Sequence, residues 1–160
     1  MAITMQVSGL EEISRMLEKL GDAAPEVAAK ALYDGAGVMA DAYTDAALSI
    51  KAEKFHYAHH GRKRLASFEE KAALVGKTGV AKFSKNGSEV GTSVGLSGKL
   101  GYVEIAGRRI AVRLIANAVN KGTEFRTRDT AFRRAASKAK DAASAAIVSK
   151  AEKLFDEMTK

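Results

Sequence analysis

The hydrophobic residues of this chain change their spacing twice, from a helical period to a strand period and back again. Residues 25–50 are compatible with one long helix, and a second is predicted from a cap at Asp129 or Thr130 nearly to Met158. From Val80, apolar and polar residues alternate instead, as they do in strands. Because both kinds of element must bury their apolar faces on one another, the sequence predicts an α+β fold.

The strand-like region contains two turn patterns. "VAKFSKNGSEVGTSVGL" places Asn86 and Gly87 between two alternating runs. A type I′ turn needs positive φ at both central residues, so an Asn-Gly pair there favours a long β-hairpin. "GYVEIAGRRIAVRL" adds at least one more strand, with a turn at Ala106–Gly107. We therefore predict a small antiparallel β-sheet that is packed on one side by the two long helices.

The N-terminal region predicts a short strand over residues 3–7, followed by a short N-terminal helix with one apolar stripe from Leu10 to Leu20. In the long helix that comes next, Gly35 and Gly37 each cost about 1 kcal/mol relative to alanine. We expect a kink at these glycines, or the close approach of another backbone.

The chain reads as a single domain over residues 1–160, with a long loop insertion at about 51–79. The first half of this interval is polar, basic and aromatic, and the second half holds a short helix with a predicted cap at Ser67. Loops of this length in a compact domain are usually functional or disordered. We expect residues 51–64 to be mobile in the free protein and to become ordered on docking.

Composition narrows the classes of function. The chain has 26 Lys and Arg against 19 Asp and Glu, a formal charge of +7 and a pI of about 9.6, which favours anionic partners or an acidic protein surface. It has no cysteine, which excludes disulfides, thiolate zinc ligands and a thiol nucleophile. No signal peptide is recognisable, and no apolar run approaches the ~18 residues of a membrane span. We expect a protein made in a cytoplasm, without a membrane partner.

The motifs of common enzymes and metal sites are incomplete. His56, His59 and His60 cluster in "FHYAHHGRKR", but Glu53 is the nearest carboxylate, so an exposed polar loop is favoured over a metal site. "GKT" at residues 76–78 lacks the glycine that a phosphate-binding loop requires five positions earlier. "GTSVG" at residues 91–95 lies in a predicted strand, the wrong context for a nucleophilic serine. We therefore predict no enzyme activity, no metal and no cofactor.

Basic residues gather in two segments, "KFHYAHHGRKR" and the approach to the last helix. Because a helix N-terminus already carries roughly half a positive charge, arginines there do not stabilise the helix and must face outward or pair with carboxylates elsewhere. The predicted contact residues for a partner or for DNA are Lys54, His59, His60, Arg62, Lys63, Arg64, Arg126, Arg128, Arg133 and Arg134. Gly122 and Thr123 form a predicted turn just before the arginines that lead into the last helix.

Three stretches in this order resemble the tail-component family of long-tailed bacteriophages, which are small tail-completion or head-tail joining (neck) proteins: "MQVSGLEEISRMLEKLGDAAPEVAAKAL", "KTGVAKFSKNGSEVGTSVGLSG" and "IANAVNKGTEFRTRDTAFRRA". The residues that match the family pattern are Gly9, Leu10, Glu12, Thr78, Gly79, Gly122, Thr123, Phe132 and Ala135. Relatives often carry Glu-Phe before the Gly-Thr and Pro-Phe ahead of the final helix, where this chain has Asn120–Lys121 and Ala131–Phe132.

The resemblance implies a non-enzymatic structural subunit of the virion, synthesised in the bacterial host cytoplasm. It implies a ring of copies, sixfold, between the head connector (stopper) and the tail-terminator or tail-tube proteins, with DNA in the channel. On this interpretation Gly122 and Thr123 let the chain leave the sheet, Phe132 packs the last helix onto it, and the arginines face a partner or DNA. The residues alone also favour an alternative, a standalone non-specific nucleic-acid-binding protein, because of the charge and "HHGRKR".

Overall fold

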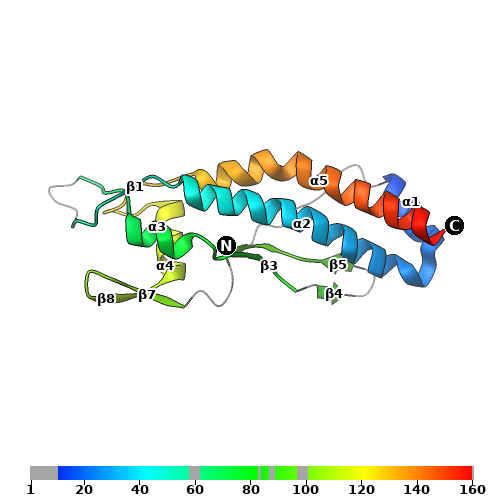
Figure 1. Cartoon of the computed structure of the whole chain (residues 1–160), viewed down its shortest axis with the longest axis horizontal. Helices are drawn as coiled ribbons and strands as arrows, with labels where there is room; N and C mark the ends of the chain where they lie inside the picture. The colour runs from blue at the N-terminus through cyan, green and yellow to red at the C-terminus, as the bar shows by residue number, and fades with distance from the viewer. Residues whose placement is uncertain (1–10, 58–61, 83, 87–88, 97–100, 160) are drawn as a thin grey trace.

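The computed structural model describes residues 11–57, 62–82, 84–86, 89–96 and 101–159. Its framework is a pair of long helices, α2 (Ala24–Ser49) and α5 (Ala131–Met158), which run antiparallel along the length of the molecule (Figure 1). The short helix α1 (Glu11–Leu20) packs against both, and a 3₁₀ turn, Gly21–Ala23, joins it to α2. The strand predicted over residues 3–7 lies outside the described residues.

In the sequence, the described part of the chain between α2 and α5 contains eight short strands and two further helices. The helices are α3 (Phe68–Leu74) and α4 (Val112–Lys121). The strands are β1 (Ala52–Glu53), β2 (Ala66–Ser67), β3 (Thr78–Val80), β4 (Ser84–Asn86), β5 (Glu89–Gly91), β6 (Val94–Leu96), β7 (Tyr102–Ile105) and β8 (Arg108–Ala111). The predicted α+β class is confirmed, although these strands form separate two-stranded pairs, one of them parallel.

The predicted long hairpin is present as two consecutive ladders. Thr78 pairs with Leu96 in the first ladder, β3–β6, and Asn86 pairs with Glu89 in the second, β4–β5. The register shifts by one residue between them, which is the arrangement of a β-bulge and divides the hairpin into two short pairs. Since Asn86 is itself paired, it is the last strand residue and not the first turn residue as predicted. Gly87 lies outside the described residues.

The second predicted hairpin, β7–β8, is confirmed. Its turn has φ of 50° at Ala106 and 72° at Gly107, so both central residues have the positive φ of a type I′ turn. Ile105 is buried, and Val103 and Ile110 on the same strands pack against the core, which attaches the hairpin to α3 and α4. The chain enters α4 directly after β8, without the longer strand expected from "AVRL".

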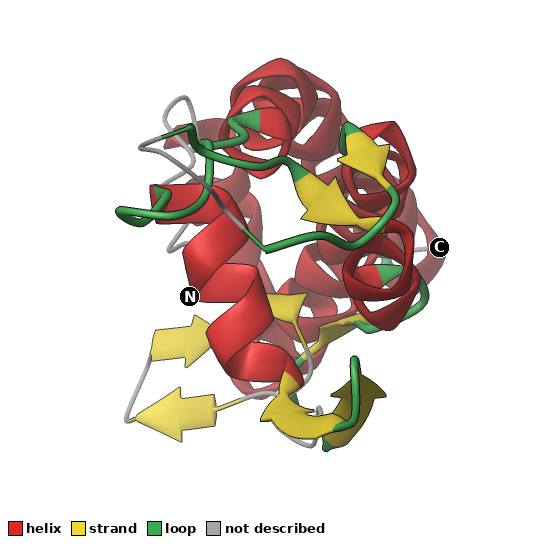
Figure 2. Ribbon diagram, turned by 90° about the vertical axis from the view of Figure 1, so that its left-hand side faces the viewer, coloured by secondary structure: helices red, strands yellow, loops and turns green. Residues whose placement is uncertain are grey.

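The layers differ from the predicted arrangement, in which both long helices cover the sheet. Helix α2 packs against β3, β5 and β6 on one side and against α5 on another, so it separates α5 from the long hairpin. The hydroxyl groups of Thr44 in α2 and Thr78 in β3 are hydrogen-bonded at 2.6 Å. Seen end-on, the long helices lie to one side of the hairpin strands (Figure 2).

Gly35 confirms the predicted close approach of backbones. A Cβ atom added to Gly35 would lie 2.4 Å from Cγ1 of Ile147 and 2.9 Å from the backbone oxygen of Ala143. Small residues on either side of this contact, including Ala31 and Ala151, are also buried. The absence of a side chain at Gly35 therefore sets the distance between α2 and α5.

Gly37 behaves in the opposite way. It lies on the solvent side of α2, where an added Cβ would have nothing within 4 Å. Replacing Gly37 with alanine should therefore raise the free energy of unfolding by about 0.5–1 kcal/mol, because alanine loses less backbone entropy in a helix. Urea denaturation followed by circular dichroism measures this change. A lower midpoint in the variant would mean that the glycine has a role in the isolated fold.

The interval 51–79 is only partly a loop: residues 54–57 and 62–65 form no helix or strand apart from an isolated bridge at Arg64, whereas the second half is structured. It contains β1, β2 and α3, and it places Ala66 and Leu74 in the core. The predicted cap at Ser67 is confirmed, since Oγ of Ser67 accepts a hydrogen bond from the Glu70 N–H at 3.1 Å and Oε2 of Glu70 accepts one from the Ser67 N–H at 2.7 Å. Polar composition suggested exposure, but Phe55 and Val75 also pack against the core, whereas Tyr57 and Phe68 are exposed.

Candidate interaction surfaces

A buried ion-pair cluster of Arg64, Glu70 and Arg126 fixes one end of the molecule. Glu70 is 1% exposed, and Arg64 binds both its oxygens, from Nη1 to Oε2 at 2.8 Å and from Nη2 to Oε1 at 2.7 Å. Nη2 of Arg126 donates to Oε1 as well. With the bond from the Ser67 N–H, this carboxylate accepts four hydrogen bonds. We call these three residues the Arg-Glu-Arg triad.

The backbone at the triad joins two segments that are far apart in sequence. The Arg64 N–H donates to the Phe125 carbonyl at 3.0 Å, and the Thr127 N–H donates to the Arg64 carbonyl at 2.8 Å. Oδ2 of Asp129 accepts a further hydrogen bond from the Lys51 N–H at 3.2 Å. The two basic segments identified in the sequence therefore lie side by side at one end of the molecule.

Two predicted contact residues are corrected by this geometry. Arg126 is 8% exposed, and the Arg64 side chain is 12% exposed, so neither presents its guanidinium to a partner. Of the two alternatives expected for these arginines, facing outward or pairing with a carboxylate, both residues adopt the second. Glu70 was missed as a partner, although it precedes Leu74 by four residues and so shares the apolar side of α3. A carboxylate in that position needs a buried cation.

The electrostatics of the triad keep the carboxylate charged. Burial alone would raise the pKa of Glu70, but hydrogen bonds from Arg64 and from the Ser67 N–H, together with the charges of both arginines, outweigh burial and hold that pKa below its usual value. Burial lowers the pKa of Arg126, whereas the hydrogen bond to Glu70 raises the pKa of Arg64. Both guanidiniums remain charged in proteins, so the triad carries a net positive charge.

The lowered pKa of Glu70 predicts a loss of stability in acid. The contribution of a depressed carboxyl pKa is complete above the unfolded value, about 4.3, and is lost as the pH falls through the lower folded value. We expect the urea midpoint of the wild type to fall between about pH 5 and pH 3, and that of Glu70→Gln to fall less over the same range. Equal decreases in the two proteins would show that other carboxyl groups cause the acid effect.

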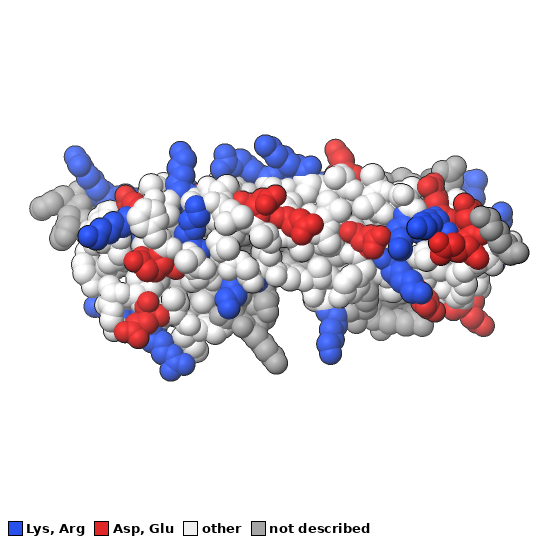
Figure 3. All heavy atoms as spheres, in the orientation of Figure 1, with Lys and Arg blue, Asp and Glu red and all other residues white. Residues whose placement is uncertain are grey.

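The remaining basic residues form an exposed surface around the start of α5 (Figure 3). Lys51, Arg128 and Arg134 line a cavity of about 250 Å³ together with Asp129 and Thr130. Asp129 and Thr130 were the two predicted caps of the last helix. Oδ1 of Asp129 accepts a hydrogen bond from the Ala131 N–H at 2.8 Å, whereas the Thr130 side chain forms no capping hydrogen bond. The exposed predicted residues at this end are Lys54, Arg62, Lys63, Arg128, Arg133 and Arg134. His59 and His60 lie outside the described part of the chain.

Lys51 and Lys138 were not among the predicted contact residues. Both are exposed, and Lys138 follows Arg134 by one helical turn of α5. The spacing of four residues on a predicted helix could have indicated Lys138. Only the tertiary structure places Lys51 beside that helix, through its hydrogen bond to Asp129.

The Gly-Thr turn is confirmed, but it ends a helix and does not lead out of a sheet as predicted. Gly122 has φ of 73° and caps α4, its N–H donating to the Ala118 carbonyl at 3.0 Å. An added Cβ would lie 3.1 Å from that of Arg128, so glycine is required there by both backbone and packing. Phe132 likewise packs on a helix and not mainly on a sheet, with its ring 5.7 Å from that of Tyr43 in α2.

Together these features define an α+β scaffold with a rigid helical pair and a basic surface at one end. Within the described residues no group of three or more His, Asp or Glu side chains is arranged to hold a metal ion. None of the described helices combines the length and the apolar character that crossing a membrane requires. In comparisons with known proteins, no family model, no curated protein and no solved structure matches this chain.

Proposed function

We propose that the protein is a structural subunit of the neck or tail of a long-tailed bacteriophage, acting in tail completion or head-tail joining as one member of a ring, sixfold, between head connector and tail tube. Its partners are copies of itself, the stopper, and the tail-terminator or tail-tube proteins. The order of elements that resembles the tail-component family supports this proposal. The observation that carries it is the exposed basic surface beside the start of α5, held on a rigid body.

The architecture suits a subunit that docks on several neighbours. A closed ring needs two different surfaces on each copy, held at a fixed angle. The extensive α2–α5 packing joins the N-terminal and C-terminal parts of the described chain, and the Arg-Glu-Arg triad joins the segment before α3 to the segment before α5. The β7–β8 pair is two-stranded among the described residues, and an edge strand can pair with a neighbouring subunit.

Disruption of the gene in the phage that encodes this chain tests the proposal. The lysate should contain DNA-filled heads that lack attached tails, or tails that fail to join heads, and supplying the protein from a plasmid should restore joined particles. Negative-stain electron microscopy distinguishes these products. Normal tailed and infectious particles from the disrupted phage would show that the proposal is wrong.

One observation favours a second candidate, non-specific nucleic-acid binding. Tyr57 and Phe125 are 56% and 63% exposed at the same end as the basic surface, and aromatic rings beside arginines and lysines can stack on bases while the cations contact phosphates. In this case a fluorescent oligonucleotide should bind with an affinity that falls steeply with salt, by about 0.7 to 0.9 logarithmic units of affinity per phosphate contact for each tenfold rise in salt. Anisotropy titrations measure this, and a salt-independent or undetectable affinity would exclude it.

A further inference from the structure

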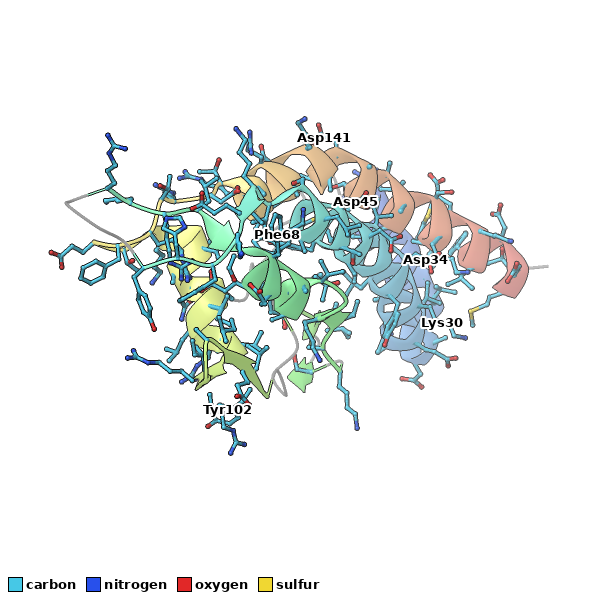
Figure 4. The ribbon with its side chains drawn as sticks, turned by 60° about the vertical axis from the view of Figure 1, so that its left-hand side comes forward. Lys30, Asp34, Asp45, Phe68, Tyr102 and Asp141 are labelled. Carbon is cyan, nitrogen blue, oxygen red and sulfur yellow. The ribbon has the colours of Figure 1, made fainter. Side chains whose placement is uncertain are left out.

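The outer face of α2 is acidic. Asp34, Asp41 and Asp45 are exposed, and their spacing of seven and four residues places them on one side of the helix. Figure 3 shows a row of acidic side chains over α2, and Figure 4 labels Asp34 and Asp45 along its length. No hydrogen bond or ion pair holds the carboxylates of Asp41 and Asp45 within the part of the chain that the structure describes, whereas Asp34 forms an ion pair with Lys150 at 3.8 Å.

Gly37 lies beside this row of aspartates and is partly exposed. Helical periodicity places it between Asp34 and Asp41, and no neighbouring atom of the described chain explains the absence of a side chain, in contrast to Gly35. A glycine lowers the stability of a helix interior, and one that gives no packing advantage within the chain leaves room for another molecule to approach the helix backbone. We call residues Asp34, Gly37, Asp41 and Asp45 the acidic face.

The opposite charge is concentrated at the start of α5. Lys51, Arg128, Arg134 and Lys138 are exposed there, and we call these residues the basic rim. Arg134 and Lys138 are like charges one turn apart, and Arg134 also lies near the positive end of the α5 dipole, so both arrangements are unfavourable in the isolated chain. Asp129 accepts hydrogen bonds from the backbone N–H groups of Lys51 and Ala131, and among the described residues it forms no ion pair with a basic side chain of the rim. An acidic partner would relieve this repulsion.

We propose that the acidic face of one copy docks on the basic rim of a second copy, head to tail. The two surfaces carry opposite charge, and Gly37 lets the second copy approach the α2 backbone. Because the two surfaces differ, each copy retains one free surface of each kind, so the contact propagates and closes into a ring where the angle permits. This inference rests on the proposed ring assembly and names its two contact surfaces.

Charge reversal tests the contact on the full chain. Sedimentation velocity at low salt should show that the wild type associates as its concentration rises, and that Asp41→Lys/Asp45→Lys and Arg134→Glu/Lys138→Glu are each monomeric. An equimolar mixture of the two variants should associate again, because a lysine-bearing face then meets a glutamate-bearing rim. The matched control is Asp156→Lys/Glu157→Lys, which reverses two exposed charges at the other end of α5 and should associate as the wild type does.

Gly37→Ala gives a second measurement that does not depend on charge. It should weaken association while the thermal midpoint of the monomer rises, a combination that loss of folding cannot produce. Circular dichroism of every variant confirms that it is folded.

A wild type that stays monomeric at low salt, or a mixture that fails to associate, would show that the inference is wrong. Loss of oligonucleotide binding in the Arg134→Glu/Lys138→Glu variant, with no association of the mixture, would assign the basic rim to nucleic acid instead. None of these results tests the proposed neck or tail function, which depends on the gene-disruption experiment. The docking contact and the proposed function can therefore be shown wrong independently.

Discussion

Replacing Glu70 with alanine should lower the free energy of unfolding by about 3–5 kcal/mol, because it leaves two largely buried guanidiniums without their shared carboxylate. It also removes the side-chain half of the capping box at the start of α3. Denaturation in urea at neutral pH measures the loss. Since a small domain is stable by only about 5–15 kcal/mol, the variant should be close to unfolding at ordinary temperature.

Glu69→Ala is the matched control for this substitution. Glu69 is the neighbouring residue of the same helix, but it is exposed, and it should change the free energy of unfolding by no more than about 0.5 kcal/mol. A second variant, Arg64→Met/Glu70→Leu/Arg126→Met, replaces the whole triad with apolar side chains and should recover much of the lost stability. Equal losses for Glu70→Ala and Glu69→Ala would mean that the triad does not stabilise the fold.

Replacing Gly35 with alanine should lower the free energy of unfolding by about 1–3 kcal/mol, even though alanine favours helix formation. The new methyl group would overlap Ile147 and the Ala143 carbonyl oxygen, and the oxygen belongs to a helix backbone that cannot rotate away. The two long helices must therefore separate. Thermal and urea denaturation, compared with Gly37→Ala in the same helix, should show changes of opposite sign.

A double-mutant cycle identifies the cause. Ile147→Ala removes the side-chain atoms nearest to the new methyl group, so the loss caused by Gly35→Ala should be smaller in the Ile147→Ala background than in the wild type. Strictly additive losses would place the effect of Gly35→Ala somewhere other than the α2–α5 contact.

The triad also explains why some arginines of the two basic segments are buried while their basic neighbours are exposed. Arg64 and Arg126 are consumed in joining the segment before α3 to the segment before α5. The basic residues on either side of them remain exposed and are the ones available to a partner. The Arg-Glu-Arg triad thus fixes the position of the two segments that carry the exposed basic surface.

The turns and helix caps of this fold could be predicted from the residues next to them in the sequence. The hairpin turn at Ala106–Gly107, the cap at Ser67 and the positive φ at Gly122 each depend on residues within one turn of the chain, and each could be predicted. The alternation after Val80 identified the long hairpin, but not the one-residue shift that divides it. Periodicity does not reveal such a shift, because the alternation of apolar and polar residues shows which face a residue is on and not which residue it pairs with.

The candidate surfaces were only partly predictable for a related reason. Charge clusters in a sequence show where cations are, but whether a guanidinium faces water or a buried carboxylate depends on which distant segment packs beside it. Arg126 and Arg128 are two residues apart, yet the first is buried against Glu70 and the second is exposed. The acidic face of α2 was overlooked because its aspartates are spread over the twelve residues from Asp34 to Asp45 and become one surface only on a helix.

The sequence by itself determined the α+β class, the positions of the long helices and the two hairpins, because helix propensity, periodicity and turn chemistry act between near neighbours. Only the tertiary structure decided that Gly35 is a helix contact while Gly37 is not, and that Glu70 pairs both with the nearby Arg64 and with the distant Arg126. These choices depend on packing between segments far apart in sequence, where a difference of a few ångströms changes a contact into open space.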